Sequence, residues 1–492
     1  MAEIGLNKKQ MQVFTSPANE ILYGGAAGGG KSYLIRALAV SLCYDIPNLQ
    51  IYLFRRTYPD LIANHMNGYM SFPEMLGSFI EKKQVTIVEQ EIRWSNGSRI
   101  HLCHAQHEKD VLKYQGAEIH VLLIDEITHF TEYQYRFLRN RVRIGGLKIP
   151  EQWAKRIPLI LVGGNPGGVG HAWVKRTFID MCQPYALHQM QDKDGGMLRQ
   201  YIPARLDDNP ILTQNDPNYI ARLTGLGNEA LVKAMRDGDW DVVAGAAFEH
   251  LSRDRHCIRP FEIPEWWTKW TSLDWGSSKP YAVGWYTINE ETLILKARGN
   301  YPEVVIGKGS IIMYRELYGW NGTPDCGSRE ESWEVAKKIA EIEEGERISY
   351  RIADSAMWAV HDGASIATRF MDALEQFGAT CPTMEKSLKD RVANYQEIRA
   401  RLSLSDGENT GFYVFDTCVH FWRTVPDLVL DERHPEKGWD TRQEDHIADQ
   451  LGYSLVSQPV IMDRATHIEQ AYQESRRLAF EADRGSKNAS RY

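Results

Sequence analysis

One short segment constrains the fold of this chain more than any other: Gly-Ala-Ala-Gly-Gly-Gly-Lys-Ser at residues 25–32. It follows an apolar run at 21–23 and precedes a helical pattern at 33–41. Glycines let backbone N–H groups curl around phosphate oxygens, and the start of the helix adds partial positive charge. The segment matches GxxxxGK[ST], in which the lysine reaches the β- and γ-phosphates and the hydroxyl ligates Mg²⁺. We therefore expect ATP and magnesium to be bound by Gly25, Ala26, Ala27, Gly28, Gly29, Gly30, Lys31 and Ser32.

A second strand-like run ends in two acidic residues. Residues 121–124 are all aliphatic, and Asp125 and Glu126 follow directly. In open α/β sheets, ligands bind outside the carboxyl ends of the strands, which is where these carboxylates would lie. Asp125 is expected to hold magnesium through water or Ser32, and Glu126 is expected to polarise the attacking water. The pair therefore predicts hydrolysis of the bound nucleotide.

Further side chains are placed to serve this site. Asn165 closes the apolar strand at 159–162, where an amide could sense the γ-phosphate. Gln10 stands 21 residues before Lys31, a spacing that suits hydrogen bonds to adenine, and Arg56 ends the strand at 50–54. Hydrolysis also needs positive charge at the transferring phosphoryl group, which a neighbouring subunit often provides. Arginines cluster at 136–143, and we predict that Arg139 or Arg141 is the arginine finger that supplies this charge. The alternative is that these arginines are solvated or bind DNA phosphates.

The second half of the chain holds a different set of carboxylates. Asp274 and Asp354 each end a strand-like run, and Asp445 and Asp449 share one face of a helix start. Carboxylates that converge in this way repel one another unless a cation lies between them, and oxygen ligands select Mg²⁺ or Mn²⁺. Two such ions activate water and stabilise the leaving oxygen of a phosphodiester. The order strand, strand, helix predicts an RNase H-like nuclease, with secondary candidates His361, Asp362 and His446.

The pattern along the chain predicts α/β folds in several parts. Short β-rich runs alternate with helical stretches in the first third, which indicates a parallel-core sheet, with one hairpin inserted at 85–105 around Asn96-Gly97. In the second half, strands are expected at 270–273, 282–288, 292–297, 350–353 and 412–415, with 282–288 and 292–297 as a hairpin, and helices at 330–343, 366–377 and 389–402. We expect a P-loop ATPase domain at 1–200, a linker or lid at 201–264 with one helix near 219–237, an RNase H-like domain at 265–460 and a helical tail at 461–492.

The composition agrees with a protein that handles nucleic acid transiently. The formal net charge is −8, and residues 266–460 alone carry −10, so a permanent cationic coat for nucleic acid is excluded. The seven cysteines lie far apart without a CxxC pair, which disfavours disulfide scaffolds and zinc ribbons. No run approaches the roughly 18 apolar residues of a membrane span. We expect a soluble intracellular protein.

In their order, these motifs resemble the large terminase subunit of tailed bacteriophages. The resemblance covers almost the whole chain and rests on segments 24–32, 55–59, 114–116, 121–126, 164–166, 238–240, 245–248, 273–276, 353–356 and 445–449. Only the phosphate loop is specific by itself. Many relatives end the last motif in Asp-Ala-Leu-Arg-Tyr, whereas this chain has Asp-Gln-Leu-Gly-Tyr at 449–453. Both Asp445 and Asp449 therefore stay open as the third metal ligand.

The resemblance implies a viral DNA-packaging motor with an ASCE-type ATPase and an RNase H-like endonuclease. Lys31 and Ser32 would bind ATP with Mg²⁺, Glu126 would be the catalytic carboxylate, and Asn165 would belong to the coupling motif. Asp274 and Asp354 would be the first ligands of two Mg²⁺ or Mn²⁺ ions. Implied partners are double-stranded DNA, the portal of an empty capsid, a small terminase subunit, and further copies in a ring expected to be a pentamer. The chain would act in the cytoplasm of the bacterial host and would not remain in the mature virion.

Two other functions remain as alternatives. A P-loop helicase-nuclease of DNA repair or plasmid maintenance would share the phosphate loop, although residues after 165 lack obvious helicase motifs. A portal-docking assembly adaptor would depend chiefly on the tail helix near 468–480. Cleavage of plasmid DNA in the presence of manganese distinguishes the nuclease from the adaptor.

Overall fold

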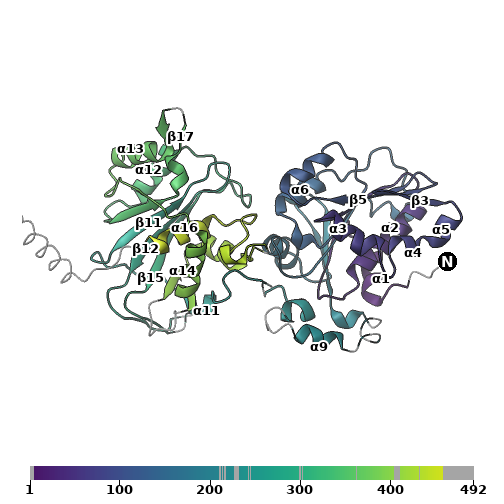
Figure 1. The fold of residues 1–492 in the computed structure, drawn as a ribbon, viewed down its shortest axis with the longest axis horizontal. Helices are drawn as coiled ribbons and strands as arrows, with labels where there is room; N and C mark the ends of the chain where they lie inside the picture. Colours follow the sequence, from purple (N-terminus) through teal and green to yellow (C-terminus); the bar gives the residue numbers. More distant parts are fainter. Residues whose placement is uncertain are drawn as a thin grey trace, which may run out of the picture.

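The chain folds into two lobes that are joined by residues 205–256 (Figure 1). The first lobe is drawn in purple and blue, and the second in teal, green and yellow. The computed structural model describes residues 5–457 except 210, 211, 213, 215, 217, 226–231, 242, 244, 299, 300, 302, 362, 404–410 and 432. The predicted tail at 461–492 lies outside the described residues, as does Asp362.

A nine-stranded sheet forms the centre of the first lobe. Its strands follow the order β3 (Val85–Val88), β4 (Glu91–Trp94), β5 (Arg99–His104), β2 (Gln50–Arg55), β6 (Val121–Asp125), β7 (Leu159–Gly164), β1 (Glu20–Gly25), β9 (Leu198–Ala204) and β8 (Leu187–Gln189). From β5 to β9 every neighbouring pair is parallel. The strand β7 separates β1, which leads into the phosphate loop, from β6, which carries Asp125. A single strand between the strand of the phosphate loop and the strand of the acidic pair is the strand order of ASCE-type ATPases. The predicted fold class is therefore confirmed for this half.

The hairpin predicted around Asn96-Gly97 is present. β4 and β5 pair in antiparallel fashion around it, and Gly97 has a φ of 89°, in the left-handed region that glycine tolerates. β5 also pairs in parallel with β2, and β3 pairs with β4 at the sheet edge. The hairpin is therefore an extension of the main sheet, because β5 supplies one of its parallel strands.

Hydrophobic cores cover both faces of this sheet. Ile21 and Tyr23 belong to one buried cluster and Leu22 to another, because successive side chains of a strand point to opposite faces. The helices that pack around them are α1 (Lys8–Thr15), α2 (Lys31–Asp45), α3 (Tyr58–Leu61), α4 (Phe72–Met75), α5 (Gly77–Glu81), α6 (Glu132–Arg139) and α7 (His171–Val174). α1 and α6 each begin with a capping box, from Asn7 and Thr131 respectively.

The connection between the lobes passes over the phosphate loop. It contains α9 (Tyr219–Thr224) and the π-helical segment η8 (Lys233–Asp237), both within the range 219–237 where one helix was expected, and then α11 (Arg253–His256). The N–H of Ala27 donates to the carbonyl of Met235 at 2.7 Å. A Cβ on Gly238 would lie only 2.6 Å from the nitrogen of Ala26. Only glycine fits where this segment crosses the loop.

A seven-stranded mixed sheet forms the centre of the second lobe. Its strands follow the order β10 (Cys257–Ile258), β20 (Phe412–Phe415), β15 (Ile311–Tyr318), β12 (Ala282–Ile288), β11 (Lys269–Asp274), β16 (Tyr350–Ala353) and β19 (Glu385–Lys386). β12 is antiparallel to both of its neighbours, whereas the remaining pairs are parallel. β11 and β12 form a hairpin, β15 adds a third antiparallel strand, and β16 pairs in parallel with β11 on its other side. This is the RNase H-like strand pattern. The predicted fold class is therefore confirmed for this half as well.

One predicted pairing in this lobe is wrong. Residues 282–288 and 292–297 do not form a hairpin with each other, because β12 is fully buried between β11 and β15. The following strand, β13 (Leu293–Leu295), pairs instead with β14 (Val304–Ile306) in a separate two-stranded sheet. The predicted helices of this lobe are present as α12 (Ser332–Ile342), α13 (Ile366–Gln376) and α14 (Arg391–Ser403), and two further helices are α15 (Val419–Thr424) and α16 (His446–Val456).

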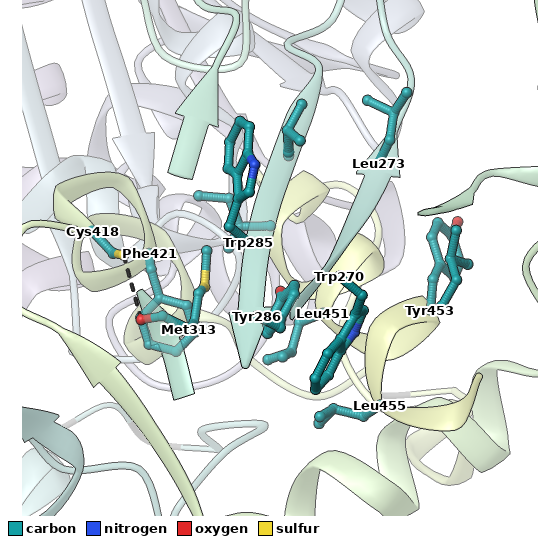
Figure 2. Close-up of a cluster of buried hydrophobic side chains, with 14 of the residues drawn as sticks. Trp270, Leu273, Trp285, Tyr286, Met313, Cys418, Phe421, Leu451, Tyr453 and Leu455 are labelled. Carbon is teal, nitrogen blue, oxygen red and sulfur yellow. Dashed lines mark hydrogen bonds between the residues drawn. The ribbon is translucent and has the colours of Figure 1, made fainter. Parts of the chain in front are cut away.

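The core of the second lobe joins α16 to the sheet. Figure 2 shows side chains of β11, β12, β15 and α16 meeting in one cluster, with Trp270 and Tyr286 from the sheet close to Leu451 from the helix. The sulfur of Cys418 donates to the carbonyl of Met313 at 3.8 Å at the edge of this cluster (Figure 2). Across the described part of the chain, none of the helices is long and apolar enough to cross a membrane.

Candidate nucleotide and nuclease sites

The phosphate loop is held open by side chains from outside it. Gly25, Gly28 and Gly30 have φ values of 138°, 76° and 74°, which side chains with a Cβ rarely adopt. The carbonyls of three consecutive glycines are each bound by one side chain: Asn209 donates to Gly28 at 2.7 Å, Tyr23 to Gly29 at 3.0 Å and Gln10 to Gly30 at 2.9 Å. Each fixed carbonyl orients the next N–H in the opposite direction, as a phosphate-binding loop requires.

Lys31 is buried and makes two hydrogen bonds. Its Nζ donates to the carbonyl of Ala26 at 2.7 Å and to Oδ1 of Asn165 at 2.6 Å. Burial lowers the pKa of Lys31, whereas the nearby Glu126 and Asp125 oppose that shift. The structure thus brings together Lys31 and Asn165, which lie 134 residues apart.

Asp125 is fully buried at the end of β6, and three side chains bind it. Ser32 Oγ lies 3.1 Å from both carboxylate oxygens, and Arg55 Nε donates to Oδ2 at 3.0 Å. Nε2 of His65 lies 3.1 Å from the same Oδ2. Burial opposes ionisation of Asp125, but the hydrogen bond from His65 and the charge of Arg55 outweigh it and hold the pKa well below its usual range. The predicted Ser32–Asp125 pair therefore exists, with two partners that the motifs did not reveal.

Glu126 follows in a left-handed backbone conformation, with a φ of 59°. Burial, and then the charge of Asp125, raise the pKa of Glu126. A raised pKa suits a carboxylate that accepts a proton from water. Arg55 Nη2 lies 3.9 Å from Glu126 Oε1, so one arginine reaches both carboxylates. A positive φ on a residue other than glycine is strained, and such strain clusters at functional sites.

The remaining predicted residues of this half are less directly placed. Gln10 is buried against the carbonyl of Gly30, and Arg56 lies beside Arg55 after β2. Arg139 points away from the phosphate loop: it donates to the carbonyl of Asp194 at 2.8 Å and lies 3.6 Å from Glu20 Oε1, at the opposite end of β1. Arg141 donates to the carbonyl of Gln115 at 2.9 Å. The assignment of an arginine finger stays a prediction.

Four aspartates meet at one edge of the second sheet. Asp274 ends β11 and Asp354 follows β16, and the register Leu273–Ala353 places these strand ends side by side. Asp445 caps α16, and Asp449 lies in its first turn. Burial raises the pKa of Asp274, with Asp354 adding to the shift, and it raises that of Asp449, with Asp445 and Asp274 adding. Burial and the charge of Asp274 raise the pKa of Asp445 to about 7.

Hydrogen bonds between α16 and the sheet keep these aspartates together. Trp270 Nε1 donates to Ser454 Oγ at 2.8 Å, and Ser272 Oγ donates to the carbonyl of Gln450 at 2.7 Å. The hydroxyl of Tyr286 donates to Gln450 Oε1 at 2.7 Å. All these groups are buried, so α16 cannot slide along β11 without leaving polar groups unpaired.

The predicted secondary candidate His446 and two groups that the motifs left aside, Lys389 and Trp439, bind the aspartates. Nδ1 and Nε2 of His446 lie 3.1 Å from Asp274 and from Asp325 respectively. Lys389 Nζ lies 2.7 Å from Asp354 Oδ1, and Trp439 Nε1 donates to Asp445 at 3.1 Å. Asp325 and Lys389 lie in loops without a motif, so only their position in the fold identifies them. His361 lies in the short strand β17 (Val360–His361).

The carboxylate oxygens of the four aspartates suit a divalent metal ion, although the aspartates are not arranged as a complete metal site. Within the described ranges, no three His, Cys, Asp or Glu groups already form a metal-holding arrangement. The four carboxylates, two of them buried and two partly exposed, supply hard oxygen donors, which Mg²⁺ and Mn²⁺ prefer. Mutual repulsion and burial raise the pKa values of three of them, and a divalent ion would relieve both effects. The residues present therefore fit the predicted ions.

A trough lies between the two lobes. Two cavities of about 390 and 320 Å³ adjoin, since Glu132, Trp173, Arg176, Pro324 and Arg423 line both. The second cavity reaches Asp325 and hence the His446–Asp274 pair. The larger cavity has only two acidic groups, Glu132 and Asp194, against six basic ones: Arg136, Arg139, Arg176, Lys193, Arg199 and Arg423.

Comparison with known protein families finds one match, which covers part of the first lobe. The family model "Terminase large subunit, T4likevirus-type, N-terminal" matches residues 22–151, which include the phosphate loop, Asp125 and Glu126. A search of curated proteins gives no match.

Several solved structures are similar at low sequence identity. The large terminase of a thermophilic bacteriophage, in complex with ADP, is 16% identical with a TM-score of 0.37, over 92% of this chain and 99% of that one. The HK97 bacteriophage large terminase is 11% identical with a TM-score of 0.46, over 91% and 95%. The P22 large terminase nuclease domain is 14% identical with a TM-score of 0.31, over 43% and 91%. The family match over residues 22–151, together with the strand orders of the two sheets, confirms the predicted resemblance to the large terminase subunits.

Proposed function

We propose that this chain is the motor and nuclease of viral DNA packaging. ATP hydrolysis in the first lobe would drive double-stranded DNA into a procapsid, and the second lobe would cut the concatemeric genome. The observation that carries the proposal is the presence on one chain of a phosphate loop paired with Asp125 and a cluster of four aspartates, of which Asp274 and Asp445 are buried. Neither a helicase-nuclease nor an adaptor is favoured by a separate feature of the fold.

In the first lobe, each residue near the phosphate loop has a role that its position supports. The N–H groups of the loop and Lys31 would bind the phosphates, and Ser32 with Asp125 would hold Mg²⁺. Glu126 would accept a proton from the attacking water. Lys31 now bonds Asn165, and it must exchange this partner for the γ-phosphate when ATP binds. The loss of the γ-phosphate on hydrolysis would return Lys31 to Asn165, which supports the coupling role of Asn165.

In the second lobe, Asp274, Asp354 and one or both of Asp445 and Asp449 would hold two Mg²⁺ or Mn²⁺ ions. Divalent ions lower the pKa of bound water and stabilise charge on the phosphoryl and leaving oxygens in both kinds of site. Trp439 and the Gln450 contacts would keep Asp445 and α16 in place while substrate binds. His446 and Lys389 neutralise Asp274 and Asp354 in this structure, so they would give way or rearrange when the ions enter.

The DNA backbone and the assembly partners complete the proposal. The larger cavity of the trough would bind DNA phosphates, because its lining has six basic groups against two acidic ones. The adjoining cavity, whose lining has five acidic groups against four basic ones, reaches the nuclease residues. A portal, a small terminase subunit and a pentameric ring of this chain would be the partners in the host cytoplasm. We keep the domain boundaries 1–200, 201–264, 265–460 and 461–492 as part of this proposal, and limited proteolysis would test them.

Two substitutions test the function. Lys31→Ala should abolish ATP turnover and leave nuclease activity measurable, while Asp274→Ala should abolish plasmid cleavage in manganese and leave ATP turnover intact. The two sites lie in different lobes, so each variant is the control for the other. An unchanged ATPase rate in Lys31→Ala refutes the motor, and unchanged cleavage by Asp274→Ala refutes the nuclease assignment.

A further inference from the structure

His65 is a buried partner of Asp125 that neither the motifs nor the proposed ATPase roles use. Its side chain is 0% exposed, and Nε2 lies 3.1 Å from Oδ2 of Asp125, which is also 0% exposed. The ring is supplied by the π-helical segment η1 (Ile62–Met66), which follows β2 and α3 in the chain. π-helical turns are rare and recur at functional sites. A buried imidazole bound to a predicted magnesium ligand therefore calls for a chemical role.

The other ring nitrogen determines which tautomer is present. Nδ1 of His65 lies 3.4 Å from Nη1 of Arg36. A guanidinium has only donors, so Nδ1 must be the acceptor of this contact and carry no proton. A neutral ring then carries its proton on Nε2, which donates to Asp125. The contact pair thus fixes both the direction of the hydrogen bond and the orientation of the ring.

Arg36 is itself held firmly. Its Nε donates to the carbonyl of Met70 at 2.8 Å, and its Nη1 donates to the carbonyl of Asn64 at 2.9 Å. Arg36 lies on α2 one turn after Ser32, and Ser32 binds Asp125. The sequence of contacts Ser32, Asp125, His65 and Arg36 therefore starts and ends on the helix that follows the phosphate loop. Such a closed ring leaves the carboxylate little freedom to rotate.

We propose that His65 is the positioning residue that orients the Asp125 carboxylate for the magnesium ion of bound ATP. The inference rests on the proposed ATPase function. His65 and Arg55 both bind Oδ2, which fixes the orientation of the carboxylate, and both of its oxygens lie 3.1 Å from the Ser32 hydroxyl. Outer partners of a metal-binding carboxylate are typically worth about 10- to 100-fold in metal affinity or activity. His65 acts through Asp125 and touches no reacting atom.

The test compares ATP affinity with saturating Mg²⁺ and with EDTA, by isothermal titration of the full chain. His65→Leu fills a similar volume without a donor, and His65→Gln returns an N–H at a similar reach. We expect His65→Leu to lose about 10-fold or more of the gain in ATP affinity that Mg²⁺ brings, with the affinity in EDTA unchanged. His65→Gln should keep the gain within about threefold of wild type, because it keeps the hydrogen bond. His65→Met is a second donor-free variant for use if His65→Leu does not fold.

Phe72→Leu is the matched packing control. Phe72 is fully buried, and its ring centroid lies 6.2 Å from that of His65, so this change loosens the same core without removing a hydrogen bond to Asp125. It should leave the Mg²⁺-dependent gain at the wild-type value. The inference is wrong if His65→Leu keeps the full gain, or if Phe72→Leu loses as much. Failure of the wild-type chain to bind ATP at all would instead refute the proposed function, and this inference with it.

Discussion

Nδ1 of His446 lies 3.1 Å from Oδ2 of Asp274, and Nε2 of the same ring lies 3.1 Å from Oδ1 of Asp325. Burial alone would lower the pKa of His446, but these two hydrogen bonds raise it to about 10. The ring is therefore a cation at neutral pH, placed between a predicted nuclease ligand and a loop of the interlobe trough. It explains how an acidic cluster can remain folded before a divalent ion binds.

Removal of this cation should destabilise the metal-free second lobe. In His446→Ala, the buried Asp274 loses its counter-charge, and breaking a buried ion pair costs about 3 kcal/mol or more. We expect a lower melting temperature than wild type in EDTA, and a larger recovery on addition of Mn²⁺, because the ion replaces the lost charge. His434→Ala is the control, since His434 forms an exposed pair with Glu436. Equal melting temperatures for wild type and His446→Ala would contradict the role of this cation.

The aspartate cluster predicts opposite effects of pH on stability and on metal binding. Asp445 titrates near pH 7 in the folded chain and near 3.8 when unfolded, so the folded state holds the proton more tightly. Its contribution is therefore fully present below about pH 4 and is lost as pH rises through 7, on the order of 4 kcal/mol over the whole range. In EDTA the melting temperature should fall between pH 5.5 and 8, while Mn²⁺ affinity should rise, since ligands must be deprotonated. Asp445→Asn should make the melting temperature in EDTA depend less on pH. A wild-type melting temperature that rises with pH would contradict the prediction.

Gly238 is expected to be essential for the shape of the phosphate loop. A Cβ at this residue would lie 2.6 Å from Ala26 N and 2.7 Å from Gly25 Cα, and its φ of 67° disfavours other residues. Gly238→Val should therefore displace the loop and lower ATP affinity by at least 10-fold, about 1.4 kcal/mol. Gly245→Val is the control: its φ of 77° imposes a similar backbone strain, but a Cβ there would meet nothing within 4 Å. Similar ATP affinities for the two variants would show that the contact with the loop is unimportant.

Arg139 should matter more for stability than for catalysis. Its side chain is 9% exposed, and it shares the fully buried Glu20 with Arg199 and Tyr135. Arg139→Ala leaves a buried carboxylate less neutralised and should lower the free energy of unfolding by about 1–3 kcal/mol. Arg141→Ala removes a more exposed side chain and should change it by no more than about 0.5 kcal/mol. Denaturant unfolding measures both, and an Arg139→Ala protein of wild-type stability but low ATPase activity would favour the arginine finger instead.

Local sequence patterns were sufficient wherever a residue's role depends on its immediate neighbours. The glycines of 25–30 and the strand end at Asp125-Glu126 were recognisable because phosphate binding needs a particular backbone and carboxylates at a strand terminus. Asp274 and Asp354 followed from the same strand-end argument. The predicted pairing of 282–288 with 292–297 is wrong. The short distance along the chain favoured a hairpin, but β12 is buried and its backbone groups are already paired along both edges, with β11 and β15.

The partners of the site residues could not be read from the sequence. His65 reaches Asp125 from 60 residues away, Asn165 reaches Lys31 from 134, and Asp325 meets His446 across 121. None of these pairs lies in a shared motif, and a buried histidine or a loop aspartate has no distinctive spacing. Arg55 was the one such residue with a usable signal, since it ends β2 at the same sheet edge as Asp125.

The sequence alone therefore determined which chemistry each lobe carries, because a phosphate loop and strand-end carboxylates are local patterns with local physical causes. The tertiary structure decided how those groups are tuned: the neutral His65 donor, the Lys31–Asn165 bond and the His446 cation all depend on contacts between distant segments. Burial also depends on the tertiary structure: the pKa values of Glu126 and Asp445 are raised because the packed fold removes water from around these carboxylates.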